Sequence, residues 1–113
     1  MKIVGFLLVA AVPLLAADLA TQSAWPQSAQ EDIARGKAYA ESHCARCHAI
    51  GKTGESPFKP APPFRTLHER YSVESLEEAL GEGIVTGHPA MPEFRLEPRQ
   101  IDQFMAFLKS LEQ

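Results

Sequence analysis

Cysteine is scarce in this sequence: the 113 residues contain two, and both lie in one short stretch. The sequence also lacks a run of β-branched residues of the kind that forms buried strands, so a parallel sheet is not expected. There are no internal repeats, and only residues 56–64 are rich in proline. A chain of this length with 45% hydrophobic residues can form one compact core and hardly more. We therefore expect a single domain.

The sequence has no excess of positive charge, because 11 lysines and arginines stand against 14 aspartates and glutamates and the formal net charge is -3. Nucleic acid is therefore not an expected partner. The charges are nevertheless uneven along the chain: residues 43–70 contain five lysines and arginines against two glutamates, whereas residues 71–93 contain five glutamates and no lysine or arginine. Such asymmetry would orient a docking partner, although two ordinary solvated faces are an equally open interpretation.

Long apolar runs are absent except near the N-terminus, where the uncharged residues 3–17 follow a single lysine. This layout predicts a secretory signal peptide over residues 1–20, with cleavage between residues 16 and 24. The run is short for a membrane span, and Pro13 interrupts it. We expect no stable membrane insertion unless the segment is uncleaved, in which case it would anchor the domain at the outer face of a membrane. No twin-arginine pair is present, so export by the general route is expected, with any cofactor added afterwards.

After the signal peptide, we expect a flexible segment over residues 21–29 and a folded domain over residues 30–113. Ser28 followed by Glu31 forms a capping-box pattern, which predicts a helix that begins at Ser28 and leads to the cysteines. Gly36 inside this helix is unfavourable by propensity, and the usual reason for such a glycine is the close approach of another element. We expect the last helix of the chain to pack there.

The stretch "CARCH" places Cys44, Cys47 and His48 in a C-x-x-C-H pattern. A disulfide between the cysteines would close too short a loop to stabilise the fold much, and it would give His48 no role. A thioredoxin-like pair is expected beside a βαβ unit, and a structural zinc site needs four protein ligands where the sequence has no further cysteine. The pattern instead predicts covalent attachment of a c-type haem.

The spacing of these residues explains the attachment. Residues three apart at the end of a helix lie on one face, about 5 to 6 Å apart, so Cys44 and Cys47 can both form thioethers along one edge of a porphyrin. A turn of backbone would then bring the His48 imidazole under the iron as a metal ligand. The predicted cofactor is one haem c, bound through both cysteines.

The rest of the chain is predicted to be loops and helices. Glycines and prolines between residues 49 and 63 exclude a long helix, and so long a loop in so small a domain is expected to pack on a haem face. Helices are expected over residues 64–70, from the cap Ser72 to the glycines at 81 and 83, and from Pro98 onwards. The last helix carries one apolar stripe, formed by Ile101, Phe104, Met105, Leu108 and Leu111.

An electron-transfer haem needs a second axial ligand. The candidates downstream of the motif are His68, His88, Met91 and Met105. Met105 lies on the apolar stripe, where a methionine is usually core, and His68 is expected to be solvated. Met91 has a proline close on either side, and these stiffen the loop so that a weak thioether ligand can be kept in place at little entropic cost. We predict Met91 as the second iron ligand, with His88 as the alternative.

With these residues the chain resembles a small class I cytochrome c, because "CARCH" matches the attachment motif and "HPAMPEF" matches the methionine loop before a C-terminal helix. The resemblance covers about residues 30–112, nearly the whole mature chain. It implies an all-α domain of three to five short helices wrapped around one covalently attached haem. It also implies that the first and last helices cross where Gly36 and Tyr39 meet Phe104, Phe107 or Leu108.

In the same family, a proline carbonyl accepts a hydrogen bond from the haem-ligating histidine. The segment "APPF" resembles that part of the family pattern and makes Pro62 the expected partner of His48, with Pro63 as the alternative. The family often has glycine before this proline, where this sequence has Ala61. Such a bond would fix the imidazole and raise its basicity.

If His48 and Met91 both bind iron, no coordination position stays open, and the sequence offers no obvious nucleophile and base pair. The protein is therefore not expected to be an enzyme. The resemblance implies single-electron transfer between Fe(II) and Fe(III) by a soluble carrier whose partners are redox proteins. We expect this carrier to be a monomer, and the predicted signal peptide places it in the periplasm. The alternatives are a haem-bearing subunit of a periplasmic dehydrogenase or oxidase complex and, less favoured, a haem-based sensor.

Overall fold

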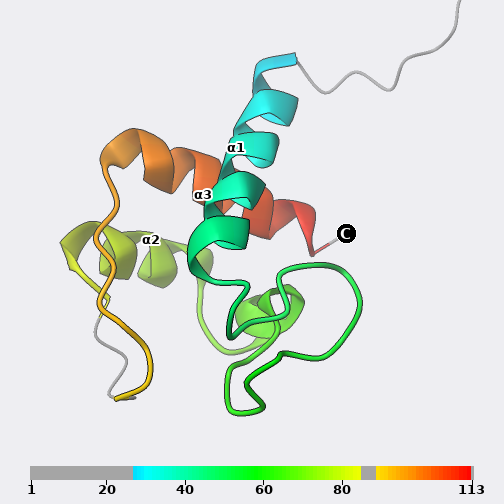
Figure 1. Cartoon of the computed structure of the whole chain (residues 1–113). Coiled ribbons are helices and arrows are strands. Elements are labelled where there is room, and N and C mark those ends of the chain that lie inside the picture. The colour runs from blue at the N-terminus through cyan, green and yellow to red at the C-terminus, as the bar shows by residue number, and fades with distance from the viewer. Residues whose placement is uncertain (1–26, 85–88, 113) are drawn as a thin grey trace, which may run out of the picture.

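The computed structural model describes residues 27–84 and 89–112 of the chain. Within these residues it contains helices and no strand (Figure 1): α1 Gln27–His43, the 3-10 helix η1 Phe64–Glu69, α2 Val73–Glu82 and α3 Pro98–Ser110. The predicted all-α class is confirmed. The predicted signal peptide, most of the segment over residues 21–29, and His88 lie outside the described residues. None of the helices in the described ranges is long and apolar enough to span a membrane.

Helices α1 and α3 cross, as Figure 1 shows, and Gly36 lies at the crossing. A Cβ atom at Gly36 would overlap the backbone carbonyl of Gln103 and lie 2.8 Å from the Phe107 Cβ. Ala40, one turn further along α1, is completely shielded from solvent. Small residues on α1 therefore let the two backbones approach closely, which confirms the predicted contact between the first and last helices.

The hydrophobic core is built on α3, because this helix presents a continuous apolar face. Its predicted stripe is buried as expected, apart from Leu111, which is half-buried and packs against the core. The other elements each bury a few residues against it. The buried core residues are Ala40, Phe64, Leu80, Leu96, Ile101, Phe104, Met105, Phe107 and Leu108.

The helix ends follow local chemistry. α1 begins at Gln27, one residue before the predicted cap, so Ser28 lies inside its first turn. The Ser72 hydroxyl accepts a hydrogen bond from the Ser75 N–H at 3.1 Å, which confirms the predicted cap of α2. α2 continues through Gly81 to Glu82 and is capped by Gly83, whose backbone φ of 107° is one that residues with a side chain rarely adopt.

The cap of α2 can be tested directly. We expect Ser72→Ala to lower the free energy of unfolding by about 1 kcal/mol, because the N–H of Ser75 would lose its acceptor. Urea unfolding of the haem-loaded protein, followed by circular dichroism, measures this loss. Ser72→Asp is the matched control, since a carboxylate keeps an acceptor at the same position. Equal midpoints for Ser72→Ala and the unchanged protein would show that the cap contributes nothing.

The predicted loop between α1 and η1 is irregular and folds back on the segment that leaves α1. The Phe58 N–H donates to the Cys47 carbonyl at 3.1 Å, and the Phe64 N–H donates to the Ala49 carbonyl at 2.9 Å. The Arg65 guanidinium donates to the Gly54 carbonyl at 2.8 Å, which joins the far part of the loop to η1. These bonds place the prolines that precede η1 beside the C-x-x-C-H motif.

Candidate functional site

The C-x-x-C-H motif lies where α1 ends and the backbone turns. The Cys44 N–H still bonds to the Ala40 carbonyl, at 2.8 Å, in the helical manner. The Cys47 and His48 N–H groups both donate to the Cys44 carbonyl, at 3.0 and 2.9 Å. These two hydrogen bonds to one carbonyl form the backbone turn that the sequence predicted at the motif. The turn keeps Cys44, Cys47 and His48 close together.

Both thiols are free and half-buried. Cys44 also packs against the hydrophobic core. Burial, and to a lesser extent the neighbouring Cys47, raises the pKa of Cys44 to about 11. The Cys44 thiol is therefore protonated at neutral pH, which argues against an activated redox pair, since such a pair depends on a low thiol pKa.

The His48 ring is oriented by the backbone of the loop. Its Nδ1 lies 2.8 Å from the Pro62 carbonyl oxygen, so the imidazole donates its Nδ1 proton to Pro62 and leaves the lone pair on Nε2. The Pro63 carbonyl is engaged elsewhere, because it accepts from both the N–H and the hydroxyl of Thr66, at 3.0 and 2.9 Å. Of the two prolines that the sequence offered, the structure therefore pairs Pro62 with His48.

The ring of Phe64 lies against His48, with the ring centroids 5.1 Å apart. Phe64 is buried and makes an edge contact with Phe104 of α3, at 5.8 Å. The imidazole is thus in contact with the apolar core through one aromatic side chain. A histidine with one nitrogen committed to a carbonyl and one face against an aromatic ring is a well-oriented ligand for a metal.

Met91 lies in the loop between α2 and α3 and is half-buried. The base of this loop is closed by two backbone hydrogen bonds, from the Ile84 N–H to the Phe94 carbonyl at 3.0 Å and from the Leu96 N–H to the Leu80 carbonyl at 2.9 Å. Met91 therefore belongs to a closed loop.

The other two candidates in the described residues lie where the sequence predicted them. Met105 is 4% exposed and belongs to the core, and His68 is exposed on η1.

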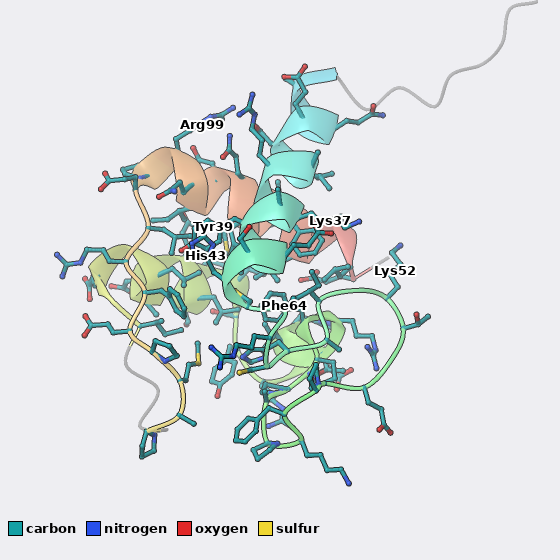
Figure 2. All side chains as sticks on the ribbon, in the orientation of Figure 1. Lys37, Tyr39, His43, Lys52, Phe64 and Arg99 are labelled. Carbon is teal, nitrogen blue, oxygen red and sulfur yellow. The ribbon has the colours of Figure 1, made fainter. Side chains whose placement is uncertain are left out.

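An aromatic stack beside the motif was not foreseen. Tyr39 and His43, one turn apart on α1, stack with their ring centroids 4.2 Å apart and an interplanar angle of 14°. Figure 2 shows these two side chains together near the end of α1, with Phe64 below them. The His43 ring also makes an edge contact with Phe94, at 6.3 Å. The spacing of Tyr39 and His43 was a usable signal, because residues four apart on a helix are neighbours.

The described residues fit a haem with thioether links better than a bare metal ion. In residues 27–84 and 89–112, no group of three or more histidine, cysteine, aspartate or glutamate side chains could hold a metal ion. The donor set at the motif is instead two thiols and one imidazole with a free Nε2.

Comparison with known proteins agrees with this donor set. A family model described as cytochrome c matches residues 33–112. A search of curated proteins and a search of solved structures gave no match. The matched range includes most of α1, the motif, the loop that contains Met91, and α3.

Proposed function

Because the chain belongs to the cytochrome c family, we propose that it is a soluble, monomeric electron carrier rather than an enzyme. The family carries covalently bound haem c and transfers electrons, and Cys44 and Cys47 are the attachment residues of this chain. The observation that carries the proposal is the hydrogen bond of 2.8 Å between His48 Nδ1 and the Pro62 carbonyl, directly beside two free thiols. Because Nδ1 of His48 is used in this hydrogen bond, Nε2 is the nitrogen that can bind the iron.

We assign His48 and Met91 as the two residues that would bind the haem iron. The Pro62 carbonyl orients the His48 imidazole. The loop closed by Ile84 and Phe94 carries Met91, whose neutral sulfur favours the reduced state relative to a second histidine. When bound, the haem supplies a one-electron couple between Fe(II) and Fe(III). With both positions taken by side chains, substrate has no place on the metal, which supports a carrier over a catalyst or a sensor.

The partners that we propose are redox proteins, met by diffusion. The glutamates of α2 are all exposed, and they belong to the acidic half of the uneven charge distribution. Such a distribution orients an encounter and speeds association more than it adds affinity. We further propose that the protein works in the periplasm, because the apolar run at residues 3–17 has the layout of a secretory signal.

The proposal is tested by expressing the full chain together with a haem-attachment system and recovering the periplasmic fraction. We expect the mature chain to carry one covalent haem, to lack a leader of about 20 residues, and to elute as a monomer. Mass spectrometry and an optical spectrum measure the first two properties, and gel filtration measures the third. The double variant Cys44→Ala, Cys47→Ala is the control and should carry no covalent haem.

Two outcomes would contradict this proposal. A mature mass without covalent haem would contradict the proposed electron-transfer function as a whole. Stable co-purification with a dehydrogenase or oxidase would instead show that the chain is the haem subunit of a complex and not a free carrier.

A further inference from the structure

The loop that carries Met91 is joined to α1 by an aromatic contact. Phe94 comes three residues after Met91, and its ring meets the edge of His43, the last residue of α1, with centroids 6.3 Å apart and planes at 90°. The two backbone bonds at the base of this loop lead only to α2 and to the loop itself. The His43–Phe94 contact therefore links the loop to the end of α1, directly before Cys44.

His43 is a prepared surface for this contact. Its Nδ1 lies 3.0 Å from the Tyr39 carbonyl, and its ring stacks on the Tyr39 ring at 4.2 Å. Tyr39 is in turn set against Phe104 of α3, in an edge contact of 5.9 Å. A hydrogen bond and a ring stack within α1 therefore fix the His43 imidazole independently of Phe94. They do so although His43 is exposed to solvent. Little ordering is needed to form the contact.

The same ring system continues to the other side of the site. Phe104 touches Phe64 at 5.8 Å, and Phe64 touches His48 at 5.1 Å. The ring contacts thus extend without a break from Phe94 in the loop, through α1 and the core, to His48. The two segments that carry the assigned axial ligands are positioned against one continuous set of aromatic side chains.

We propose that the His43–Phe94 contact keeps the loop against α1 and thereby holds Met91 on the iron, so that His43 and Phe94 are positioning residues of the electron-transfer site. This inference rests on the proposed function, in which Met91 is the sixth ligand. A thioether is a weak neutral ligand, so the fraction of protein with Met91 bound depends on how firmly its loop is held. Loss of the contact raises the fraction of protein with an open iron position.

The test uses the haem-loaded protein in its reduced form, with carbon monoxide as the probe of an open position. An aromatic pair of this kind corresponds to about a threefold to tenfold change in an equilibrium. We expect Phe94→Ala and His43→Ala each to speed carbon monoxide binding by about that factor, and the double variant to be no faster than the single variants. His43→Ala changes an exposed side chain, so the test does not depend on the loss of half-buried Phe94.

Two further variants separate positioning from general loosening. Phe94→Tyr keeps a ring and should return carbon monoxide binding to the rate of the unchanged protein. Tyr71→Ala removes a ring that is 52% exposed and lies outside the ring system, and it should leave the rate unchanged. The inference is overturned if Phe94→Ala and His43→Ala bind carbon monoxide no faster than Tyr71→Ala. It is also overturned if the rate increase in the double variant equals the product of the increases in the two single variants.

Failure of the inference differs from failure of the ligand assignment. If the unchanged oxidised protein lacks the weak far-red band of a sulfur-to-iron bond, Met91 is not the ligand. The ligand assignment and the positioning role of His43 and Phe94 are then both wrong. If the band is present and responds to Met91→Ala but carbon monoxide binding does not respond to Phe94→Ala or His43→Ala, only the positioning role is wrong.

Discussion

Gly36→Leu is expected to lower the free energy of unfolding by about 1 to 3 kcal/mol, the range seen when extra side-chain atoms enter a well-packed contact. The cause is visible at the crossing of α1 and α3. The first atom of any side chain at Gly36 would overlap the Gln103 carbonyl, which is backbone and cannot rotate away. The helices would have to separate, and Ala40 and Phe107, which are both buried, would become more exposed to solvent. Urea unfolding of the haem-loaded protein measures the change.

A matched control exists in the same chain. A Cβ atom at Gly51 would meet nothing within 4 Å, and the φ of this glycine lies outside the range that favours glycine. Gly51→Leu should therefore change the stability by no more than about 0.5 kcal/mol. An unchanged unfolding midpoint for Gly36→Leu, next to an unchanged midpoint for Gly51→Leu, would show that the crossing does not depend on a bare backbone at residue 36.

The sequence was most informative where the determinants are local. A helix cap, such as Ser72, acts on a backbone N–H three residues away, and the apolar stripe of α3 follows from the helical period. The crossing at Gly36 was also readable, because a glycine that lowers helix propensity needs a packing reason. These features place the core and the cysteine motif.

Contacts between distant segments could not be read in the same way. The glycines after Ser72 were expected to end α2 at residues 81 and 83, yet the helix continues through Gly81 to Glu82. Helix α3 lies close to Gly81, since a Cβ atom at that position would be 3.3 Å from Ile101 Cδ1. Gly81 serves packing, and only Gly83 ends the helix. A glycine pattern does not by itself distinguish these two roles.

The choice between Pro62 and Pro63 depended on a third residue. The two prolines are adjacent in sequence, and the family resemblance favoured Pro62 over Pro63 without a physical reason for the choice. In the structure Thr66 engages Pro63 through its N–H and its hydroxyl, which leaves Pro62 to His48. The contact between His43 and Phe94 was missed because the two residues are far apart in the chain, and neither the helix pattern around His43 nor the methionine loop that ends at Phe94 indicates that they meet.

Met91→Ala is expected to abolish the far-red sulfur-to-iron band of the oxidised protein while the haem stays covalently attached through Cys44 and Cys47. The same change should lower the reduction potential and let carbon monoxide bind the reduced iron readily, because a methionine ligand raises the potential and closes the sixth position. An optical spectrum, a redox titration and carbon monoxide binding measure the three effects. The retained covalent haem, seen by mass, separates this result from a failure of maturation.

Met105→Leu is the control for Met91→Ala. Met105 is buried in the core, so a nearly volume-conserving exchange should leave the band and the potential in place. His88 is near Met91 in the chain and could replace the lost sulfur once neutral, and the measurement therefore belongs below pH about 6.5, where an ordinary histidine is mostly protonated. Should Met105→Leu remove the band while Met91→Ala keeps it, the second ligand would come from α3 and the loop that carries Met91 would have no part in binding the iron.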